Sequence, residues 1–122
     1  MKKATIYHNP KCSKSRGALA ILEERGFNTE VILYLDTPPN TDTLSQLLTE
    51  MGMSARDLLR TNEEPYKTLN LADKKLSEQQ LIQAMVENPV LINRPIVQTE
   101  FGTKLGRPLE KIECILSNNG DK

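Results

Sequence analysis

One cysteine lies in a segment that favours nucleophilic chemistry. Cys12 stands between a short apolar stretch and the first turn of a predicted helix, within the run Tyr-His-Asn-Pro-Lys-Cys-Ser-Lys-Ser-Arg at residues 7–16. The first turn of a helix offers unpaired N–H groups and partial positive charge, which stabilise a thiolate and can hold an oxyanion. A buried structural cysteine would not share so polar and basic a neighbourhood. The segment therefore predicts a nucleophile and an anion site in one loop.

Two polar residues near Cys12 are candidates to tune its thiol. Ser15 occupies the place where a Cys-x-x-Cys redox motif has its second thiol. A hydroxyl can donate a hydrogen bond to a thiolate but cannot form a disulfide, so a resolving thiol would have to come from elsewhere. His8 is either an ordinary polar residue at a strand end, or a cation or hydrogen-bond partner that lowers the thiol pKa. Cys114 has nothing near it in the sequence that argues for activation, and we interpret it as a spectator.

Three arginines are candidates to bind an oxyanion. Arg94 precedes Pro95 at the predicted entry to a strand, and Arg107 precedes Pro108 where a strand gives way to a helix. A guanidinium group binds oxyanions in a fixed geometry, so a pair of arginines at sheet ends is suggestive. Arg60 lies at a predicted helix end, where a solvated surface charge is the ordinary interpretation. Spacing alone does not bring these side chains to Cys12.

The elements that must position these residues follow from the apolar pattern and the capping residues. Strands are predicted at 4–7, 30–35, 95–99 and 104–107, and the first helix at 13–25. The continuous apolar run at 30–35 is typical of a strand covered on both faces. Further helices are predicted from the patterns at 44–51, 54–59, 64–66 and 77–86, and a last helix begins at Pro108 before a frayed tail at 118–122.

The order of these elements predicts the fold class. Strand, helix and strand at this spacing form a βαβ unit with parallel strands. The whole order is βαβ, a helical insertion at about 40–90, then ββα with a turn at 101–102 between its strands. We therefore expect an α/β, thioredoxin-like fold with a helical insertion between its halves, forming one domain over residues 1–122.

Composition limits the classes of function. Sixteen Lys and Arg balance sixteen Asp and Glu, so no overall charge favours binding to nucleic acid or to an anionic membrane. The first residues are basic, but their apolar stretch is too short for a signal peptide, and no run is long enough to span a bilayer. We expect a cytoplasmic protein. Two distant cysteines and one histidine give neither a disulfide framework nor a metal site.

Taken together, the motifs resemble those of one family. The chain is similar over nearly its whole length to the glutaredoxin-dependent arsenate reductases, which have a thioredoxin fold. The resemblance rests on five blocks, in the order and spacing of that family, at residues 7–16, 32–35, 58–60, 91–97 and 106–108.

The resemblance implies a role for each candidate residue. Cys12 would be the nucleophile, His8 would help to lower its pKa, and Ser15 would hydrogen-bond the thiolate. Pro95 would follow a cis peptide bond. The arsenic oxyanion would be bound by three arginines, Arg60, Arg94 and Arg107.

The resemblance also implies a reaction. Cys12 would attack arsenate, glutathione would add to the arsenic as a co-substrate, and glutaredoxin would remove the glutathione as arsenite is released. No metal and no tightly bound cofactor would be required. Two alternatives stay open, a related thiol reductase acting on glutathione mixed disulfides and a non-catalytic regulator of the same fold that binds RNA polymerase. Such regulators typically carry a Cys-x-x-Cys switch, and Ser15 argues against that alternative.

Overall fold

A computed structural model describes residues 2–116 of the chain. These residues divide into two compact units, one formed by the residues up to Thr37 and from Arg94 onward, the other by Pro38–Asn93. The helical insertion expected at about 40–90 falls within the second unit. The expectation of a single domain over residues 1–122 stays a prediction.

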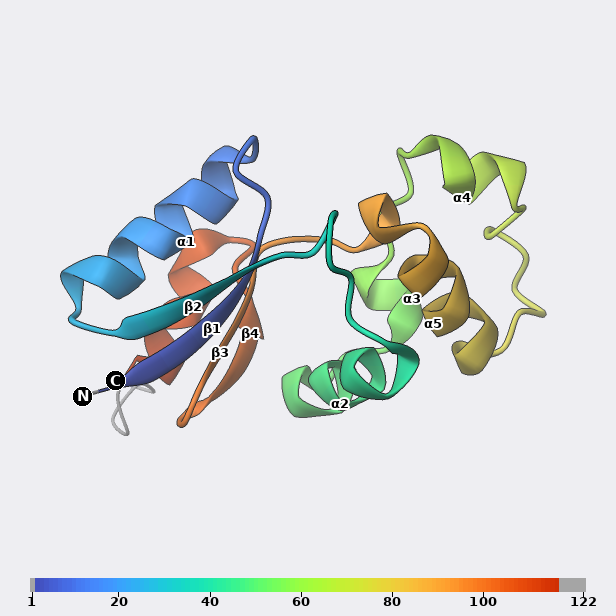
Figure 1. The fold of residues 1–122 in the computed structure, drawn as a ribbon. Helices are drawn as coiled ribbons and strands as arrows, with labels where there is room; N and C mark the ends of the chain where they lie inside the picture. Colours follow the sequence, from blue (N-terminus) through green and yellow to red (C-terminus); the bar gives the residue numbers. More distant parts are fainter. Residues whose placement is uncertain (1, 117–122) are drawn as a thin grey trace. The chain divides into compact units, whose positions relative to one another are not determined.

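The first unit is built around a four-stranded sheet. It contains β1 (Lys3–His8), α1 (Ser13–Glu24), β2 (Asn28–Leu33), β3 (Ile96–Thr99), β4 (Gly102–Leu105) and the 3₁₀ segment η2 (Leu109–Ile115). The strand order is β2-β1-β3-β4, as Figure 1 shows. β1 and β2 are parallel, with Ile6 opposite Val31, whereas β3 runs antiparallel to both β1 and β4. This arrangement confirms the predicted α/β, thioredoxin-like fold.

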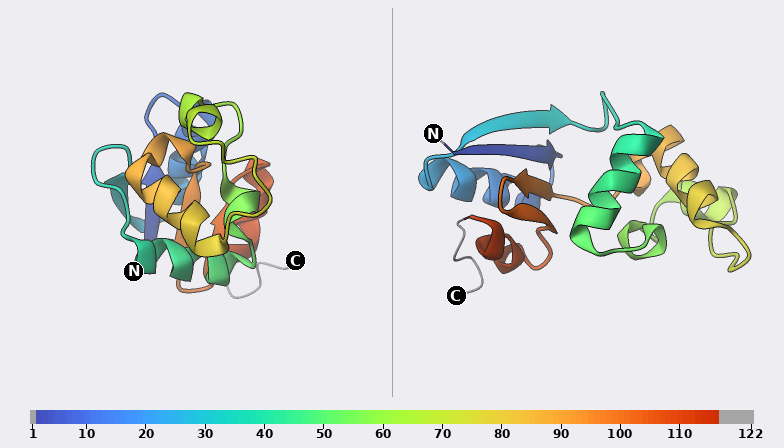
Figure 2. Two further views of the ribbon diagram at one scale, coloured as in Figure 1. Left: turned by 90° about the vertical axis from the view of Figure 1, so that its right-hand side faces the viewer. Right: turned by 90° about the horizontal axis from the view of Figure 1, so that it is seen from below.

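The core of this unit lies on one face of the sheet. α1 and η2 both cover that face, as the right-hand view of Figure 2 shows. Ile6 and Val97 from the central strands are fully buried there against Leu22 of α1 and Ile112 of η2. Since apolar burial is the main stabilising term in folding, this contact fixes α1, and with it the residue at its N-terminus, against the sheet.

The prediction that residues 30–35 are covered on both faces is wrong. Val31 and Leu33 are 42% and 40% exposed, and Leu35, which follows β2, is 42% exposed. β2 is an edge strand of the sheet and pairs with β1 only. The expectation assumed a strand in the middle of a covered sheet. The apolar composition of the run indicates a strand, but does not say which strand lies at the edge.

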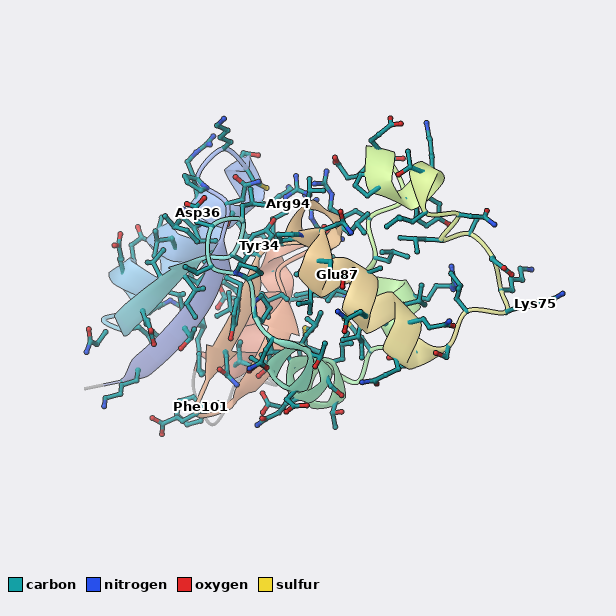
Figure 3. The ribbon with its side chains drawn as sticks, turned by 45° about the vertical axis from the view of Figure 1, so that its right-hand side comes forward. Tyr34, Asp36, Lys75, Glu87, Arg94 and Phe101 are labelled. Carbon is teal, nitrogen blue, oxygen red and sulfur yellow. The ribbon has the colours of Figure 1, made fainter. Side chains whose placement is uncertain are left out.

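The C-terminal part of the unit also differs from the expectation. β4 begins at Gly102, within the predicted turn, and ends at Leu105 rather than at residue 107. Figure 3 shows Arg94 and Phe101 near the two ends of β3. The last helix is a 3₁₀ segment, and Pro108, with its backbone extended, precedes it rather than occupying its first position. The predicted tail at 118–122 lies outside the described residues.

The second unit is helical, as predicted. It contains α2 (Thr41–Met51), α3 (Ala55–Leu58), α4 (Glu64–Thr68), α5 (Glu78–Glu87) and the 3₁₀ turn η1 (Pro89–Leu91). α3 and α5 both begin with a capping box, in which the hydroxyl of Ser54 or Ser77 accepts from the N3 backbone N–H and the N3 side chain accepts from the N–H of that serine. The box at Ser77 is the one that the pattern at 77–86 predicts. No helix among the described residues has the length and apolar character that a membrane crossing requires.

Candidate active site

Cys12 is the N-cap residue of α1, as the sequence predicts. The loop before it turns tightly, because the Cys12 N–H donates to the Asn9 carbonyl at 2.9 Å. The Cys12 carbonyl in turn accepts from the Arg16 N–H at 3.0 Å and so opens the helix. The cysteine is buried, with 7% of its surface exposed. Its thiol therefore lies at the positive end of α1, with the first N–H groups of the helix beside it.

Opposing effects set the acidity of this thiol. Burial by itself raises the pKa of Cys12, because a low dielectric disfavours the charged thiolate. Hydrogen bonds from the backbone N–H groups of Ser15 and Lys14 lower the pKa. The positive charges of Arg94 and Arg107 lower it further. The favourable contributions prevail, so the pKa of Cys12 lies below that of an ordinary cysteine.

Arg107 extends from the sheet end to the sulfur. Its Nε donates to the Arg94 carbonyl at 2.8 Å, and its Nη2 lies 3.8 Å from Cys12 Sγ as a donor. The Gly106 N–H donates to the Pro95 carbonyl at 2.8 Å and so links the two segments that carry these arginines. The Arg94–Pro95 bond is cis, as the resemblance implies, and the Arg107–Pro108 bond is also cis, which was not predicted. Arg94 and Arg107, which are far from Cys12 in the sequence, therefore place their positive charges near its sulfur.

The Ser15 hydroxyl does not hold the sulfur itself. It lies 2.7 Å from Nδ1 of His8 and accepts from the Asn9 N–H at 3.0 Å. Ser15 and His8 are both buried, with 0% and 6% of their surfaces exposed. The backbone N–H of Ser15, rather than its hydroxyl, is the group that stabilises the Cys12 thiolate. The hydrogen bond from Ser15 to the thiolate, which the resemblance implies, therefore comes from the backbone of this residue.

His8 is a hydrogen-bond partner rather than a cation. Burial is the larger cause that lowers its pKa below 6.5, and the positive charge of Arg16 adds to the effect. The imidazole is therefore neutral at pH 7. Of the two functional interpretations of His8, the structure favours the hydrogen-bond partner, acting on Ser15 at the first turn of α1.

Two residues that the sequence analysis did not single out hold the loop before Cys12. Arg16 Nη1 donates to the Pro10 carbonyl at 2.8 Å, and the Asn9 side-chain oxygen accepts from the Lys11 N–H at 3.0 Å. The Asn-Pro pair is a known turn signal and could have indicated the second contact. No sequence pattern indicates the first, because it depends on the path of the loop in space.

Arg60 belongs to the second unit. Its guanidinium lies 2.9 Å from a carboxylate oxygen of Glu63 and donates to the Val90 carbonyl at 3.5 Å. These contacts hold it more firmly than a solvated surface charge, the ordinary interpretation of a residue at a helix end. Its approach to an anion at Cys12 stays a prediction.

Cys114 lies in a different environment from Cys12. It is a free, half-buried thiol that packs against the core, and its Sγ donates to the Lys111 carbonyl at 3.2 Å. Residues 2–116 bring together no group of three or more His, Cys, Asp or Glu that could hold a metal ion.

Known proteins match this chain over most of its length. The model of the ArsC family matches residues 7–115. A curated arsenate reductase of Escherichia coli is 52% identical over 116 residues, which are 95% of this chain and 82% of that protein. A second relative, the uncharacterized protein YfgD of Escherichia coli (strain K12), is 54% identical over 91% of this chain and 94% of its own.

The fold is likewise shared with solved structures. The structure described as an arsenate reductase from Vibrio cholerae superposes with a TM-score of 0.89 at 46% identity. The match covers 93% of this chain and 98% of that one. The Cys12 loop and the whole helical unit lie within residues 7–115, which the family model spans.

Proposed function

Because the chain belongs to the ArsC family, we propose that it reduces arsenate to arsenite, with Cys12 as the nucleophile. The observation that carries the proposal is the sulfur of Cys12 at the N-terminus of α1, with Arg107 Nη2 at 3.8 Å. A thiolate can approach an oxyanion only where positive charge offsets their mutual repulsion. Arg94 and Arg107 supply that charge beside the sulfur.

The first step is an attack of the Cys12 thiolate on the arsenic of bound arsenate. A sulfur–arsenic bond forms, and one arsenic-bound hydroxyl takes up a proton and leaves as water. The arsenic stays in its pentavalent state. Arg94 and Arg107 hold the remaining oxygens, and the resemblance to the family at residues 58–60 implies the same role for Arg60. The lowered pKa of Cys12 increases the share of thiolate, the nucleophilic form, at neutral pH.

The electrons come from external thiols. Glutathione displaces a second hydroxyl as water and forms its own sulfur–arsenic bond. A glutaredoxin thiolate then attacks the glutathione sulfur, the electron pair of the broken bond passes to arsenic, and arsenic becomes trivalent. The glutathione sulfur leaves as a glutaredoxin–glutathione mixed disulfide. Water then hydrolyses the bond between the Cys12 sulfur and the trivalent arsenic, which releases arsenite and restores the Cys12 thiol. Ser15 cannot act as a resolving thiol, and Cys114 is half-buried against the core, so an external reductant fits this chain.

This scheme requires neither a metal nor a bound organic cofactor, and it places the reaction in the cytoplasm, where glutathione is kept reduced. The substrates and partners are then arsenate, glutathione and glutaredoxin. The two alternatives are reduction of glutathione mixed disulfides and binding of a regulatory target without turnover.

A substrate comparison tests the proposal. The purified protein is supplied with glutathione and glutaredoxin, and with either arsenate or the mixed disulfide of glutathione and 2-mercaptoethanol. We expect arsenate-dependent consumption of reducing equivalents that also depends on glutaredoxin. Turnover of the mixed disulfide alone would establish the first alternative. Turnover of neither, together with capture of RNA polymerase subunits by the purified protein, would establish the second.

A further inference from the structure

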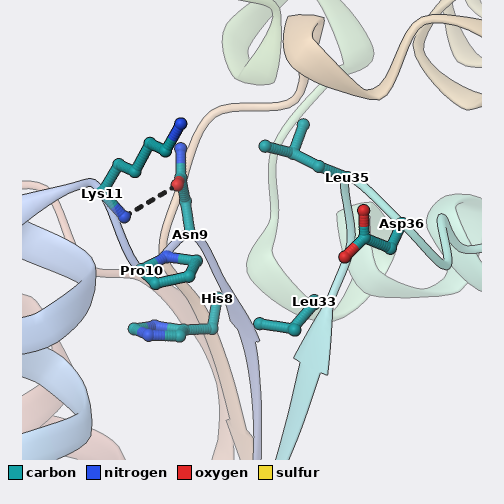
Figure 4. A pocket seen from close by; sticks show the side chains of 7 residues that line it. All are labelled: His8, Asn9, Pro10, Lys11, Leu33, Leu35 and Asp36. Carbon is teal, nitrogen blue, oxygen red and sulfur yellow. Dashed lines mark hydrogen bonds between the residues drawn. The ribbon is translucent and has the colours of Figure 1, made fainter.

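A pocket of about 250 Å³ lies beside the loop that carries Cys12. One wall is the end of β1 and the loop after it, residues 8–11. The other wall is the end of β2 and the residues after it, with Leu33, Leu35 and Asp36 facing the pocket (Figure 4). Because β1 and β2 are parallel, their carboxyl ends meet at this edge of the sheet. Cys12 is the next residue in the sequence after this first wall.

Local hydrogen bonds fix both walls. In the first wall, the Asn9 side chain accepts from the Lys11 N–H at 3.0 Å, as Figure 4 shows, and the Asn9 carbonyl accepts from the Cys12 N–H. In the second wall, the Leu33 carbonyl accepts from the N–H groups of Asp36 and Thr37, each at 2.9 Å. The pocket is therefore formed before any ligand binds, which reduces the entropy cost of binding.

The lining of the pocket combines apolar surface with opposite charges. Pro10, Leu33 and Leu35 supply the apolar part, and both leucines keep about two-fifths of their surface exposed, at 40% and 42%. Lys11 and Asp36 add one positive and one negative charge at the exposed rim. Neither Lys11 nor Asp36 takes part in an ion pair among the described residues. Such a lining suits a small zwitterion with an aliphatic body.

We propose that this pocket binds the thiol co-substrate, a small peptide thiol of the glutathione type, and orients its sulfur toward the arsenic held at Cys12. The inference rests on the proposed function. Glutathione carries two carboxylates and one ammonium group, so it can present a carboxylate to Lys11 and the ammonium to Asp36. Its backbone and methylene groups lie along Leu33 and Leu35. The pocket takes one end of the tripeptide, and the thiol reaches past Lys11 toward Cys12.

The chemical step that the pocket assists involves no change of oxidation state. The peptide thiol displaces one arsenic-bound hydroxyl, which leaves as water with the thiol proton, and a sulfur–arsenic bond forms. Holding the thiol beside the loop of the nucleophile makes this bimolecular step effectively intramolecular. His8 and Asn9 connect the pocket to the hydrogen-bond network of the active site, because both contact the Ser15 hydroxyl.

Binding can be measured without turnover. S-methylglutathione keeps the charges of glutathione but has no free thiol, so it serves as the probe. We expect its titration into the wild-type protein to shift the amide resonances of Leu33, Leu35 and Asp36 in a saturable manner. Unchanged resonances in both walls at millimolar probe would overturn the proposal, whatever the protein does with arsenate.

Kinetics supply the second test. Leu35→Asp places a negative charge against the peptide carboxylates, and Asp36→Asn removes the partner of the ammonium. We expect each change to raise KM for glutathione by about fivefold to tenfold, the loss of one charge-assisted contact. Because 2-mercaptoethanol lacks charged groups, the rate with this thiol relative to that with glutathione should increase. Matched controls are Leu69→Asp, at a leucine that is 49% exposed in the second unit, and Asp42→Asn at the start of α2.

The outcomes separate this inference from the proposed function. If the wild type binds S-methylglutathione at these residues but makes no arsenite, the pocket is a binding site for the peptide and the proposed function is wrong. If the wild type makes arsenite while both pocket variants keep the KM of the controls, the pocket is not the thiol site. A loss that is equal with glutathione and with 2-mercaptoethanol would also overturn the inference, because it would place the defect in the chemistry of Cys12.

Discussion

At the scale of single residues, the account depends on the ionisation of Cys12. Burial opposes the thiolate, whereas two backbone N–H groups and two arginines favour it, and the favourable contributions prevail. We predict a pKa below the roughly 8.5 of a free cysteine. The rate of alkylation at Cys12 should then fall as the pH drops through that lowered pKa and level off above it. The thiolate absorbance of a Cys114→Ser variant, followed against pH, measures the value directly.

A midpoint at or above the free-cysteine value would remove the activated nucleophile from the account. Replacing Arg107 by Gln supplies the control for the role of charge. The variant should titrate at a higher pH than the wild type, because a positive charge near the sulfur has been lost.

His8 predicts a dependence of stability on pH. Its pKa in the folded protein is lowered below 6.5, so the unfolded chain takes up a proton before the folded chain does as the pH falls. Stability contributed by the neutral ring is therefore present above about pH 6.5 and is lost on acidification, by at most about 1.4 kcal/mol per pH unit. We expect the free energy of unfolding in urea to fall more between pH 7.5 and 5.5 in the wild type than in His8→Gln. Equal losses in the two proteins would mean that His8 takes up its proton as readily in the folded state.

Replacing Arg94 or Arg107 by lysine is expected to impair the handling of arsenate, although the positive charge is kept. Arg94→Lys and Arg107→Lys keep the positive charge but lose the planar pair of donors that matches an oxyanion. We expect each to weaken arsenate binding or slow the Cys12 step by about tenfold or more, the worth of a hydrogen bond to a charged group. Arsenate titration with stopped-flow detection of thiolate loss separates the two effects. A surface control is Arg25→Lys, whose partner Glu113 accepts from either side chain. Near-wild-type kinetics in both site variants would make the arginines structural.

Residue types and spacing indicated much of this site. Cys12, Arg94 and Arg107 are marked by their places beside helix and strand ends, and the structure brings all three together. The use of the Ser15 hydroxyl could not be predicted, because the sequence does not say whether His8 or Cys12 lies closer to it. The same holds for Arg16, whose contact with the Pro10 carbonyl depends on the course of the loop.

At the scale of elements, the sequence predicted best those features that depend on neighbouring residues alone, such as the N-termini of helices. The patterns at 54–59 and 77–86 each begin near a serine, and Ser54 and Ser77 do cap α3 and α5. The exposure of β2 was missed because an edge position is decided by strand order and not by composition. The 3₁₀ form of η2 was missed because its apolar spacing also fits an α-helix.

Gly102, the first residue of β4, lies against Ile115 of η2, and a side chain at this position is expected to destabilise the fold. Its φ is +143°, and a Cβ there would lie 2.9 Å from Ile115 Cγ2. Gly26 also has a positive φ, +80°, but a Cβ there would meet nothing within 4 Å. We expect Gly26→Ala to destabilise by about 1 kcal/mol and Gly102→Ala by about 2 to 4 kcal/mol, since the second adds a packing clash to the backbone strain. Chemical unfolding of the two variants gives the difference, and equal losses would show that Ile115 moves aside without cost.

At the scale of the whole molecule, the balance of charge means that only the local site can attract an anion. The chain carries equal numbers of basic and acidic residues, so an arsenate ion experiences no overall attraction. Positive charge is instead concentrated where Arg94 and Arg107 meet the N-terminus of α1. Selectivity for an oxyanion must then come from the geometry of this site, a property that composition could not reveal.

The most direct measurement of the central claim is the amount of arsenite formed, determined by chromatography of arsenic species. Arsenate, glutathione and glutaredoxin are supplied to the wild type, Cys12→Ser and Cys114→Ser. The wild type and Cys114→Ser should form arsenite at similar rates, whereas Cys12→Ser should form none above the protein-free background, because a serine hydroxyl is hardly ionised at neutral pH. Arsenite formation by Cys12→Ser, or its absence in the wild type with all components present, would contradict the account.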